Sequence, residues 1–192
     1  MDFGLTPQEQ AYRKEVSDWL GKELTPELKK EFQNWYWTRV PRHGITPAVR
    51  QFMRKLGQQG YLGANWPKEY GGQGRSLIDA YIVFEEVHRH RAVFPNMVAV
   101  CFAGPTILRH GSEYLKREFL PRIAGGEIEF ALGYTEPQAG SDLASLEMRA
   151  VEDGDDYVIN GQKVFNTQTH VADYHWLAAR TDPNVPKHKG VS

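Results

Sequence analysis

The chain has 192 residues, of which 41% are hydrophobic and 24% are charged, the proportions of an ordinary soluble globular protein. This composition excludes a disordered or collagen-like chain, and the length suits one domain or two small ones. The formal net charge of -1 leaves no basic excess to neutralise phosphates. We therefore expect no nucleic acid among the partners.

The amino-terminal residues carry no basic segment followed by an apolar one, so they do not predict a signal peptide. The most apolar stretch, residues 93–108, is interrupted by Pro95 and Pro105, whereas a membrane span needs about 20 apolar residues. The single cysteine, Cys101, lies in this stretch; it suits a reduced compartment, and we expect it to be buried and inert. We predict a cytoplasmic protein without membrane insertion.

Helix-start signals recur through the first two thirds of the chain. Thr6, Pro7 and Glu9 combine an N-cap hydroxyl, a proline at the first helical position and a glutamate three residues after the cap, which is typical of a capping box. Gly126 predicts the last helix end. Further starts are predicted at Thr25, Thr46, Ser76 and Ser112. We therefore expect residues 1–126 to form an all-α helical bundle.

After Gly126 the pattern changes to short segments of alternating polarity separated by turn residues. A turn is predicted from Glu152 to Asp156, and Asn160 followed by Gly161 predicts a type I′ hairpin. Candidate strands lie at residues 127–135, 146–151, 157–159, 162–165 and 174–181. The fold class is therefore α+β: the helical bundle is followed, at residues 127–192, by an incomplete antiparallel β-barrel or sandwich domain.

The densest unusual chemistry lies in the loop from Gly133 to Asp142. A strand is predicted to end at Thr135, and Gly140 and Ser141 then offer backbone N–H groups beside a short hydroxyl side chain. Such a loop can donate several hydrogen bonds to an anionic or carbonyl-rich ligand. On local chemistry alone, an ordinary capped turn explains the same residues.

Three motifs, in order, resemble the acyl-CoA dehydrogenase family across essentially the whole chain. Residues 135–142, TEPQAGSD, resemble its T-E-P-x-A-G-S-D loop, and residues 160–167, NGQKVFNT, resemble its N-G-x-K-x-W-I-T strand. Upstream, residues 66–72, WPKEYGG, resemble its P-x-E-Y-G-G loop. The resemblance implies FAD as cofactor, α,β-desaturation of an acyl-CoA thioester, and an electron-transfer flavoprotein as electron acceptor. It also implies a homo- or hetero-tetramer for the full-length protein.

The resemblance further implies which residues contact the flavin and the substrate. Leu132, Tyr134 and Thr135 take the positions of the strand and threonine that hydrogen-bond the isoalloxazine ring. Gly140 and Ser141 take positions that approach the flavin pyrophosphate, and Ser141 also approaches the pantetheine arm of the thioester.

Two of the last three positions of the second motif, Phe165 and Asn166, depart from the family pattern, whereas Thr167 matches it. By resemblance, Phe165 packs against the flavin ring and Thr167 points at its reactive N5 edge. Phe165 replaces the family's tryptophan and loses an indole N–H, while Asn166 replaces isoleucine and brings a polar amide. These changes alter the groups that tune the ring's electron affinity, and they resemble subfamilies that act on bulky or unusual acyl groups.

No catalytic residue is predicted within this sequence. The family's base is a glutamate from a carboxy-terminal helical domain, which is absent from this chain, so we expect the base beyond Ser192 and expect the 192 residues alone to be inactive. Glu136 is expected to be the structural glutamate of the TEP loop. Two alternatives stay open: a non-catalytic subunit or fragment that pairs with a complete acyl-CoA dehydrogenase, and a flavin oxidase or monooxygenase relative.

Other conspicuous residues have structural explanations. His88 and His90 are two positions apart on a predicted helix and point to different faces, so no metal site is predicted. An aromatic cluster is expected in the core or in a subunit contact; it consists of Phe32, Trp35, Tyr36 and Trp37.

Overall fold

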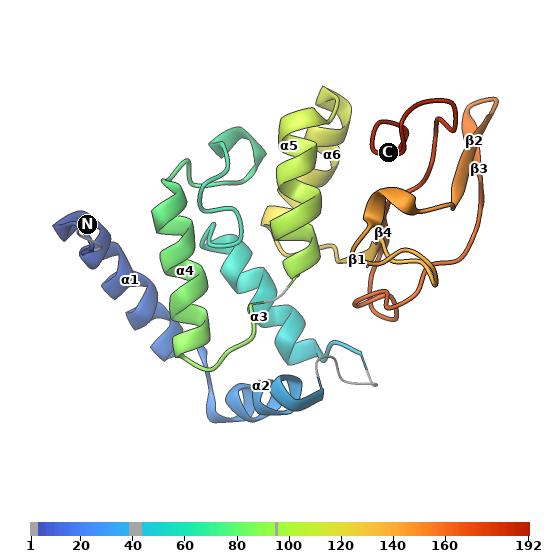
Figure 1. Cartoon of the computed structure of the whole chain (residues 1–192). Helices are drawn as coiled ribbons and strands as arrows, with labels where there is room; N and C mark the ends of the chain where they lie inside the picture. The colour runs from blue at the N-terminus through green and yellow to red at the C-terminus, as the bar shows by residue number, and fades with distance from the viewer. Residues whose placement is uncertain (1–3, 39–43, 95) are drawn as a thin grey trace. The chain divides into compact units, whose positions relative to one another are not determined.

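The computed structural model describes residues 4–38, 44–94 and 96–192. The described residues up to Glu129 form one compact unit, and Phe130–Ser192 form a second. The first unit is helical, and the second consists of short strands and loops (Figure 1). The predicted fold class, a helical domain followed by part of a β domain, is confirmed.

Side-chain caps begin five helices of the first unit. The hydroxyl of Thr6 accepts the N–H of Glu9, and the Glu9 carboxylate accepts the N–H of Thr6 at 2.7 Å. Ser76 and Asp79 form a second capping box, so the local signal in the sequence is sufficient to place these helix ends. All five predicted starts are confirmed, at α1 (Pro7–Glu23), α2 (Pro26–Thr38), α3 (Pro47–Gln58), α4 (Leu77–Arg89) and α6 (Glu113–Ala124).

Further helical turns lie where the sequence predicted none. A 3₁₀ turn spans Lys68–Tyr70, and a π-helical turn, Ala99–Ala103, runs directly into α5 (Gly104–His110). Pro105 lies within a helical run that continues without a break from the π-helical turn, so it removes one backbone hydrogen-bond donor from that run. Among the described residues, no helix combines the length and the apolar content needed to cross a bilayer.

Aromatic side chains fill the core of the helical unit. Phe52 of α3 stacks on Trp19 of α1, with ring centroids 6.2 Å apart, and meets Phe32 of α2 edge-on at 5.5 Å. Phe32 is therefore a core residue, as expected. The rest of its predicted aromatic cluster, the side chains of Trp35, Tyr36 and Trp37, lies outside the described residues.

The β unit contains two pairs of strands. β2 (Arg149–Asp153) and β3 (Asp156–Asn160) form an antiparallel hairpin that turns at Gly154 and Asp155, as predicted. β1 (Phe130–Gly133) and β4 (Tyr174–Leu177) pair in parallel, with Phe130 opposite Tyr174. The expected antiparallel meander is therefore wrong for this pair, because the long connection between the two strands brings the chain back in the same direction.

The predicted hairpin turn at Asn160 and Gly161 is also wrong. β3 ends at Asn160, and residues 161–164 leave the sheet without forming a regular strand. Gly161 has φ +150, and a Cβ there would lie 2.7 Å from the Met148 Cβ. A glycine is needed at this position because the chain passes closely over Met148, and not because it forms a tight turn.

Candidate functional site

The centre of the site is the end of β1 together with the chain that follows Gly161. The backbone N–H of Val164 donates to the Thr135 carbonyl at 2.9 Å, and the N–H of Leu132 donates to the Thr167 carbonyl at 3.3 Å. Two segments about 30 residues apart in sequence therefore lie side by side. This contact brings together six of the eight residues expected at a flavin site, namely Leu132, Tyr134, Thr135, Phe165, Asn166 and Thr167.

A buried ion pair lies at the base of these two segments. The Lys163 ammonium donates to Glu136 Oε1 at 2.8 Å, and each side chain is 3% exposed. The Glu136 carboxylate also accepts the backbone N–H groups of Glu147 at 2.7 Å and Met148 at 2.9 Å. Glu136 therefore joins the TEP loop to residues 147–148 and to the segment containing Lys163.

Two opposing effects act on the pKa of Glu136. Burial raises the pKa of its carboxyl, but hydrogen bonds from Glu147 N–H, the Lys163 ammonium and Met148 N–H outweigh burial and lower it to about 2. The carboxylate is therefore ionised and fully engaged near neutral pH. This geometry agrees with the expected structural role of Glu136 and does not suit a group that must accept a proton.

Gly140 and Ser141 lie on the exposed loop that follows the ion pair. A Cβ added at Gly140 would meet no heavy atom within 4 Å, so the loop leaves open space for a ligand there. Asp142 ends the loop and pairs with Lys187 at 2.6 Å. Arg180 holds the next turn, because its guanidinium donates to the carbonyls of Ala144 at 2.6 Å and Leu146 at 3.0 Å.

The segment from Phe165 to Gln168 has an unusual conformation. Phe165 (φ +55) and Gln168 (φ +68) both have positive φ, which non-glycine residues adopt at a cost and which is concentrated at functional sites. Phe165 is 89% exposed. Asn166 donates through Nδ2 to the Lys163 carbonyl at 3.4 Å, while Asn166 Oδ1 and Gln168 Oε1 are buried and accept no hydrogen bond within the described chain.

Two residues of the site were missed by sequence reasoning. Trp176 of β4 donates its indole N–H to the Tyr134 hydroxyl at 3.0 Å, and Lys163 donates to the Tyr134 carbonyl at 3.1 Å. The alternation of polarity in β4 is a signal for the face on which Trp176 lies. No local signal pairs Lys163 with Glu136, because the contact is set by the tertiary fold.

The helical unit contains a groove of different character. Its volume is about 620 Å³, and its walls are almost entirely apolar or aromatic. Leu77 at its rim is 73% exposed, whereas Trp66 at its base is buried. The groove can accept a bulky hydrocarbon group. Its walls include Leu77, Ile78, Tyr81, Phe84, Phe94 and Val100.

Cys101 lines this groove and is exposed, so the expectation of a buried cysteine is wrong. Ala99 and Ala103 of the same π-helical turn face the core. Cys101, which lies between them in the sequence, therefore points outward. Partial burial against the groove nevertheless raises the pKa of the Cys101 thiol, which keeps it protonated and unreactive near neutral pH.

The two histidines at the carboxy-terminal end of α4, His88 in its last turn and His90 just after it, contact separate partners. His88 Nδ1 lies 2.8 Å from the Phe84 carbonyl, and His90 Nε2 lies 2.9 Å from the Ser17 hydroxyl. They therefore point in different directions, as predicted from their spacing.

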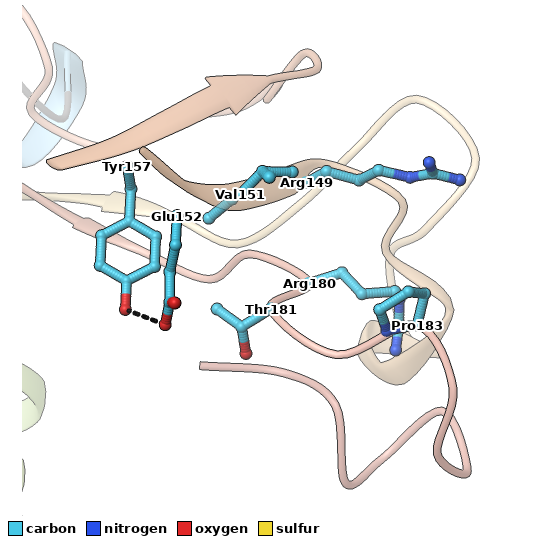
Figure 2. Close-up of a pocket in the computed structure, with 8 residues that line it drawn as sticks. Arg149, Val151, Glu152, Tyr157, Arg180, Thr181 and Pro183 are labelled. Atoms are coloured by element: carbon cyan, nitrogen blue, oxygen red, sulfur yellow. Dashed lines mark hydrogen bonds between the residues drawn. The ribbon is translucent and has the colours of Figure 1, made fainter. Parts of the chain in front are cut away.

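A second cavity, of about 470 Å³, lies beside the β2–β3 hairpin (Figure 2). The Tyr157 hydroxyl donates to the Glu152 carboxylate at 3.3 Å, and the Arg149 side chain extends away from this pair (Figure 2). The Arg180 guanidinium is already bonded to backbone carbonyls. The polar groups of this cavity do not converge on a common point, so the arrangement lacks the features of a catalytic site.

Comparisons with known proteins cover both units. The family described as "Acyl-CoA dehydrogenase, N-terminal domain" matches residues 6–127, and "Acyl-CoA dehydrogenase, middle domain" matches residues 131–192. A curated relative, Acyl-CoA dehydrogenase FadE29 of Mycobacterium tuberculosis, is 47% identical over 192 residues, which are 100% of this chain and 47% of the relative. The chain thus spans about half the length of the curated relatives it matches.

Two solved structures are similar in fold and in sequence. One, the ChsE4-ChsE5 complex from Mycobacterium tuberculosis, has a TM-score of 0.85 and 41% identity over 100% of this chain and 47% of that chain. The other, described as Tcur3481-Tcur3483 steroid ACAD, has a TM-score of 0.83 and 46% identity over 100% of this chain and 48% of that chain.

Proposed function

The chain belongs to the acyl-CoA dehydrogenase family, and from this premise we propose that it contributes the flavin contacts and acyl-group contacts of an FAD-dependent acyl-CoA dehydrogenase. The reaction is α,β-desaturation of an acyl-CoA thioester. The observation that carries the proposal is the contact between the end of β1 and residues 163–167, because it gathers hydroxyl, amide and aromatic groups from two distant segments.

The residues present fit an isoalloxazine ring. Phe165 offers an exposed aromatic face, Thr135 and Thr167 offer hydroxyl groups, and Asn166 has a buried amide oxygen without a partner in the described chain. Polar groups of this kind orient a flavin and tune its electron affinity. Bound FAD would supply the hydride acceptor of the desaturation.

The residues of this chain act by holding and shielding the reactants. Phe165 excludes water from one side of the ring, and the Thr167 hydroxyl donates a hydrogen bond at its reactive edge. Ser141, on the open loop, binds the pantetheine arm of the substrate. Donors placed in advance, in a site from which water is excluded, stabilise charge that develops on the ring during reaction.

The acyl group occupies the apolar groove of the helical unit. The groove volume of about 620 Å³ and its aliphatic and aromatic walls suit a large hydrocarbon skeleton better than a short acyl chain. The likeness to a steroid acyl-CoA dehydrogenase supports the same substrate class. We therefore propose a bulky, steroid-like acyl-CoA as substrate.

The acceptor of the substrate α-proton is a glutamate beyond Ser192 in this proposal. Glu136 does not take that role, because its carboxylate has a pKa of about 2 and accepts four hydrogen bonds, from Glu147, Met148, Lys163 and Gln138. An electron-transfer flavoprotein is the electron acceptor in this proposal.

A second candidate function is that of a subunit paired with a different acyl-CoA dehydrogenase chain. One similar solved structure is described as the ChsE4-ChsE5 complex, and the other carries two protein names, Tcur3481-Tcur3483. Co-purification with a second dehydrogenase subunit, and turnover only in its presence, supports this candidate. Rapid oxygen consumption coupled to turnover supports instead the oxidase or monooxygenase alternative.

The proposal is tested by replacing Thr167. The protein purified in its native form is expected to be yellow, and a steroid-like acyl-CoA is expected to bleach its flavin under anaerobic conditions. Thr167→Val slows this reduction by about tenfold or more, because one donor to the ring is lost. Thr181→Val, at an exposed hydroxyl beyond β4, is the control. A well-folded protein without flavin, or unchanged reduction in Thr167→Val, contradicts the proposal.

A further inference from the structure

We propose that Lys163 is the positioning residue of the flavin site and holds the end of β1 in register with the FNT segment, residues 165–167. The inference rests on the proposed flavin function. Lys163 itself is not expected to touch the flavin, because its side chain is 3% exposed and lies among protein atoms.

Lys163 and its neighbour bind the consecutive carbonyl groups of Tyr134 and Thr135, where the chain passes from β1 into the TEP loop. The Lys163 ammonium donates to the Tyr134 carbonyl at 3.1 Å, and the Val164 N–H donates to the Thr135 carbonyl at 2.9 Å. The Lys163 carbonyl in turn accepts the Asn166 side-chain amide at 3.4 Å. Lys163 thus contacts both of the segments that are expected to hold the ring.

The charge of Lys163 is compensated where it is buried. The Glu136 carboxylate accepts a hydrogen bond from the Lys163 ammonium at 2.8 Å and two more from the backbone N–H groups of Glu147 and Met148. A buried ammonium is stable only when it is paired and hydrogen-bonded in this way. The pair therefore has little freedom to move, and it transmits that rigidity to the segments it joins.

The chain runs from Lys163 almost directly into the FNT segment, so a change at Lys163 reaches the expected flavin contacts through the backbone. A displacement at Lys163 moves the FNT segment relative to Leu132, which donates to the Thr167 carbonyl at 3.3 Å. Hydroxyl and amide donors aimed at the ring stabilise its electron-rich reduced form more than its oxidised form. Loss of register is therefore expected to weaken FAD binding and to lower the reduction potential.

The test replaces Lys163 in the natively produced holoprotein, together with any subunit that co-purifies. In Lys163→Met we expect FAD to bind about tenfold more weakly, as measured by titrating the deflavinated protein with FAD. We also expect the midpoint potential of the remaining bound flavin to fall by about 30 mV, which is a tenfold change for a two-electron couple. Lys163→Gln, which keeps a neutral donor for the Tyr134 carbonyl, is expected to lie between wild type and Lys163→Met; it also serves if Lys163→Met does not fold.

Two controls separate positioning from general stability. Arg180→Met removes another part-buried cation that bonds backbone carbonyls of the β unit, so it should lower stability yet leave the flavin potential unchanged. The double variant Glu136→Gln/Lys163→Met removes both charges; it should regain stability relative to Lys163→Met without regaining FAD affinity, because the contact with the Tyr134 carbonyl stays lost.

The outcomes are distinct. An unchanged potential and FAD affinity in Lys163→Met overturn the inference, whatever its stability, and so does an equal shift of potential in Arg180→Met. Recovery of FAD affinity in the double variant also overturns it, because charge balance alone then explains the effect. A wild-type protein that does not hold FAD contradicts the proposed function itself.

Discussion

The helical unit and the β unit use polar side chains for different purposes. In the helical unit, hydroxyl groups such as those of Thr6 and Ser76 cap helix ends at the surface, and the groove walls are nearly devoid of charge. In the β unit, Lys163 and Glu136 form an ion pair whose side chains are 3% exposed. The helical unit therefore offers shape and apolar area, whereas the β unit offers fixed charges and hydrogen-bond donors.

This contrast corresponds to the two tasks that the proposed function assigns to the chain. An acyl skeleton is recognised by apolar surface, and a flavin needs polar groups held in place. It also predicts that the two units respond differently to mutation. In the Lys163–Glu136 pair of the β unit both side chains are buried, whereas the buried Glu86 of the helical unit pairs with the part-exposed Arg13, and that unit also depends on packing and caps distributed along the chain.

The largest effect is expected at Glu136. Glu136→Leu leaves the Lys163 ammonium and the N–H groups of Glu147 and Met148 buried without their acceptor, at a cost of about 3–5 kcal/mol in the free energy of unfolding. Urea unfolding measures this loss, and faster hydrogen exchange at the Met148 amide localises it. Glu147→Leu, at an exposed side chain, should change stability by about 0.5 kcal/mol or less. Equal effects of the two variants would remove the contrast between the units.

A slightly smaller effect is expected from acid. The pKa of Glu136 is lowered from 4.5 to about 2, so folding favours its charged form, and the resulting stability is present above about pH 4.5. It is lost as the pH falls toward 2, because the unfolded chain then binds the proton more readily. The lost stability is about 3 kcal/mol. Urea unfolding at successive pH values should show this slope in wild type and not in Glu136→Gln; a slope that persists in the variant assigns it to other groups.

The contrast also explains which parts of the fold could be predicted from the sequence. Thr6, Ser76 and Ser112 act on residues three positions away, so the sequence around them is sufficient to place the helices. The same holds for the turn at Gly154. The parallel pairing of β1 with β4 and the path after Gly161 depend on contacts over many residues, and the alternation of polarity carries no information about strand partners.

The candidate site was predictable only as motifs. Resemblance placed Thr135 and Thr167 in a shared flavin site, and the structure brings their segments together; their contact with flavin stays a prediction. The sequence identifies Lys163 only as one position of a motif. Its pairing with Glu136 could not be predicted, because the two residues are 27 positions apart. The exposure of Cys101 was also missed, because an apolar stretch does not reveal which side of a π-helical turn faces outward.

A moderate effect is expected at Gly104, where the helical unit depends on close packing. A Cβ at Gly104 would lie 2.2 Å from the Trp66 ring at the base of the groove, so Gly104→Ala should cost about 1–3 kcal/mol through overpacking. Gly21 of α1 is the matched control, because its added Cβ meets nothing closer than 4.0 Å. Gly21→Ala should raise stability by about 0.5–1 kcal/mol. Thermal unfolding compares the two variants. If Gly104→Ala is instead stabilising, the Trp66 ring at the base of the groove moves to make room for the added Cβ.

The smallest effect is expected at the cap of α4. Ser76 accepts the N–H of Asp79 at 3.0 Å, and Ser76→Ala should cost about 1 kcal/mol because this donor loses its acceptor. Ser76→Asp keeps an acceptor at the helix start, so urea unfolding should give a free energy of unfolding near that of wild type.

The cap precedes Leu77 and Ile78 of the groove rim. Fraying of this turn in Ser76→Ala is therefore expected to raise the KM for a bulky acyl-CoA while leaving the flavin potential unchanged. A shift of potential in Ser76→Ala would mean that the two units are coupled and that their division of tasks is incomplete.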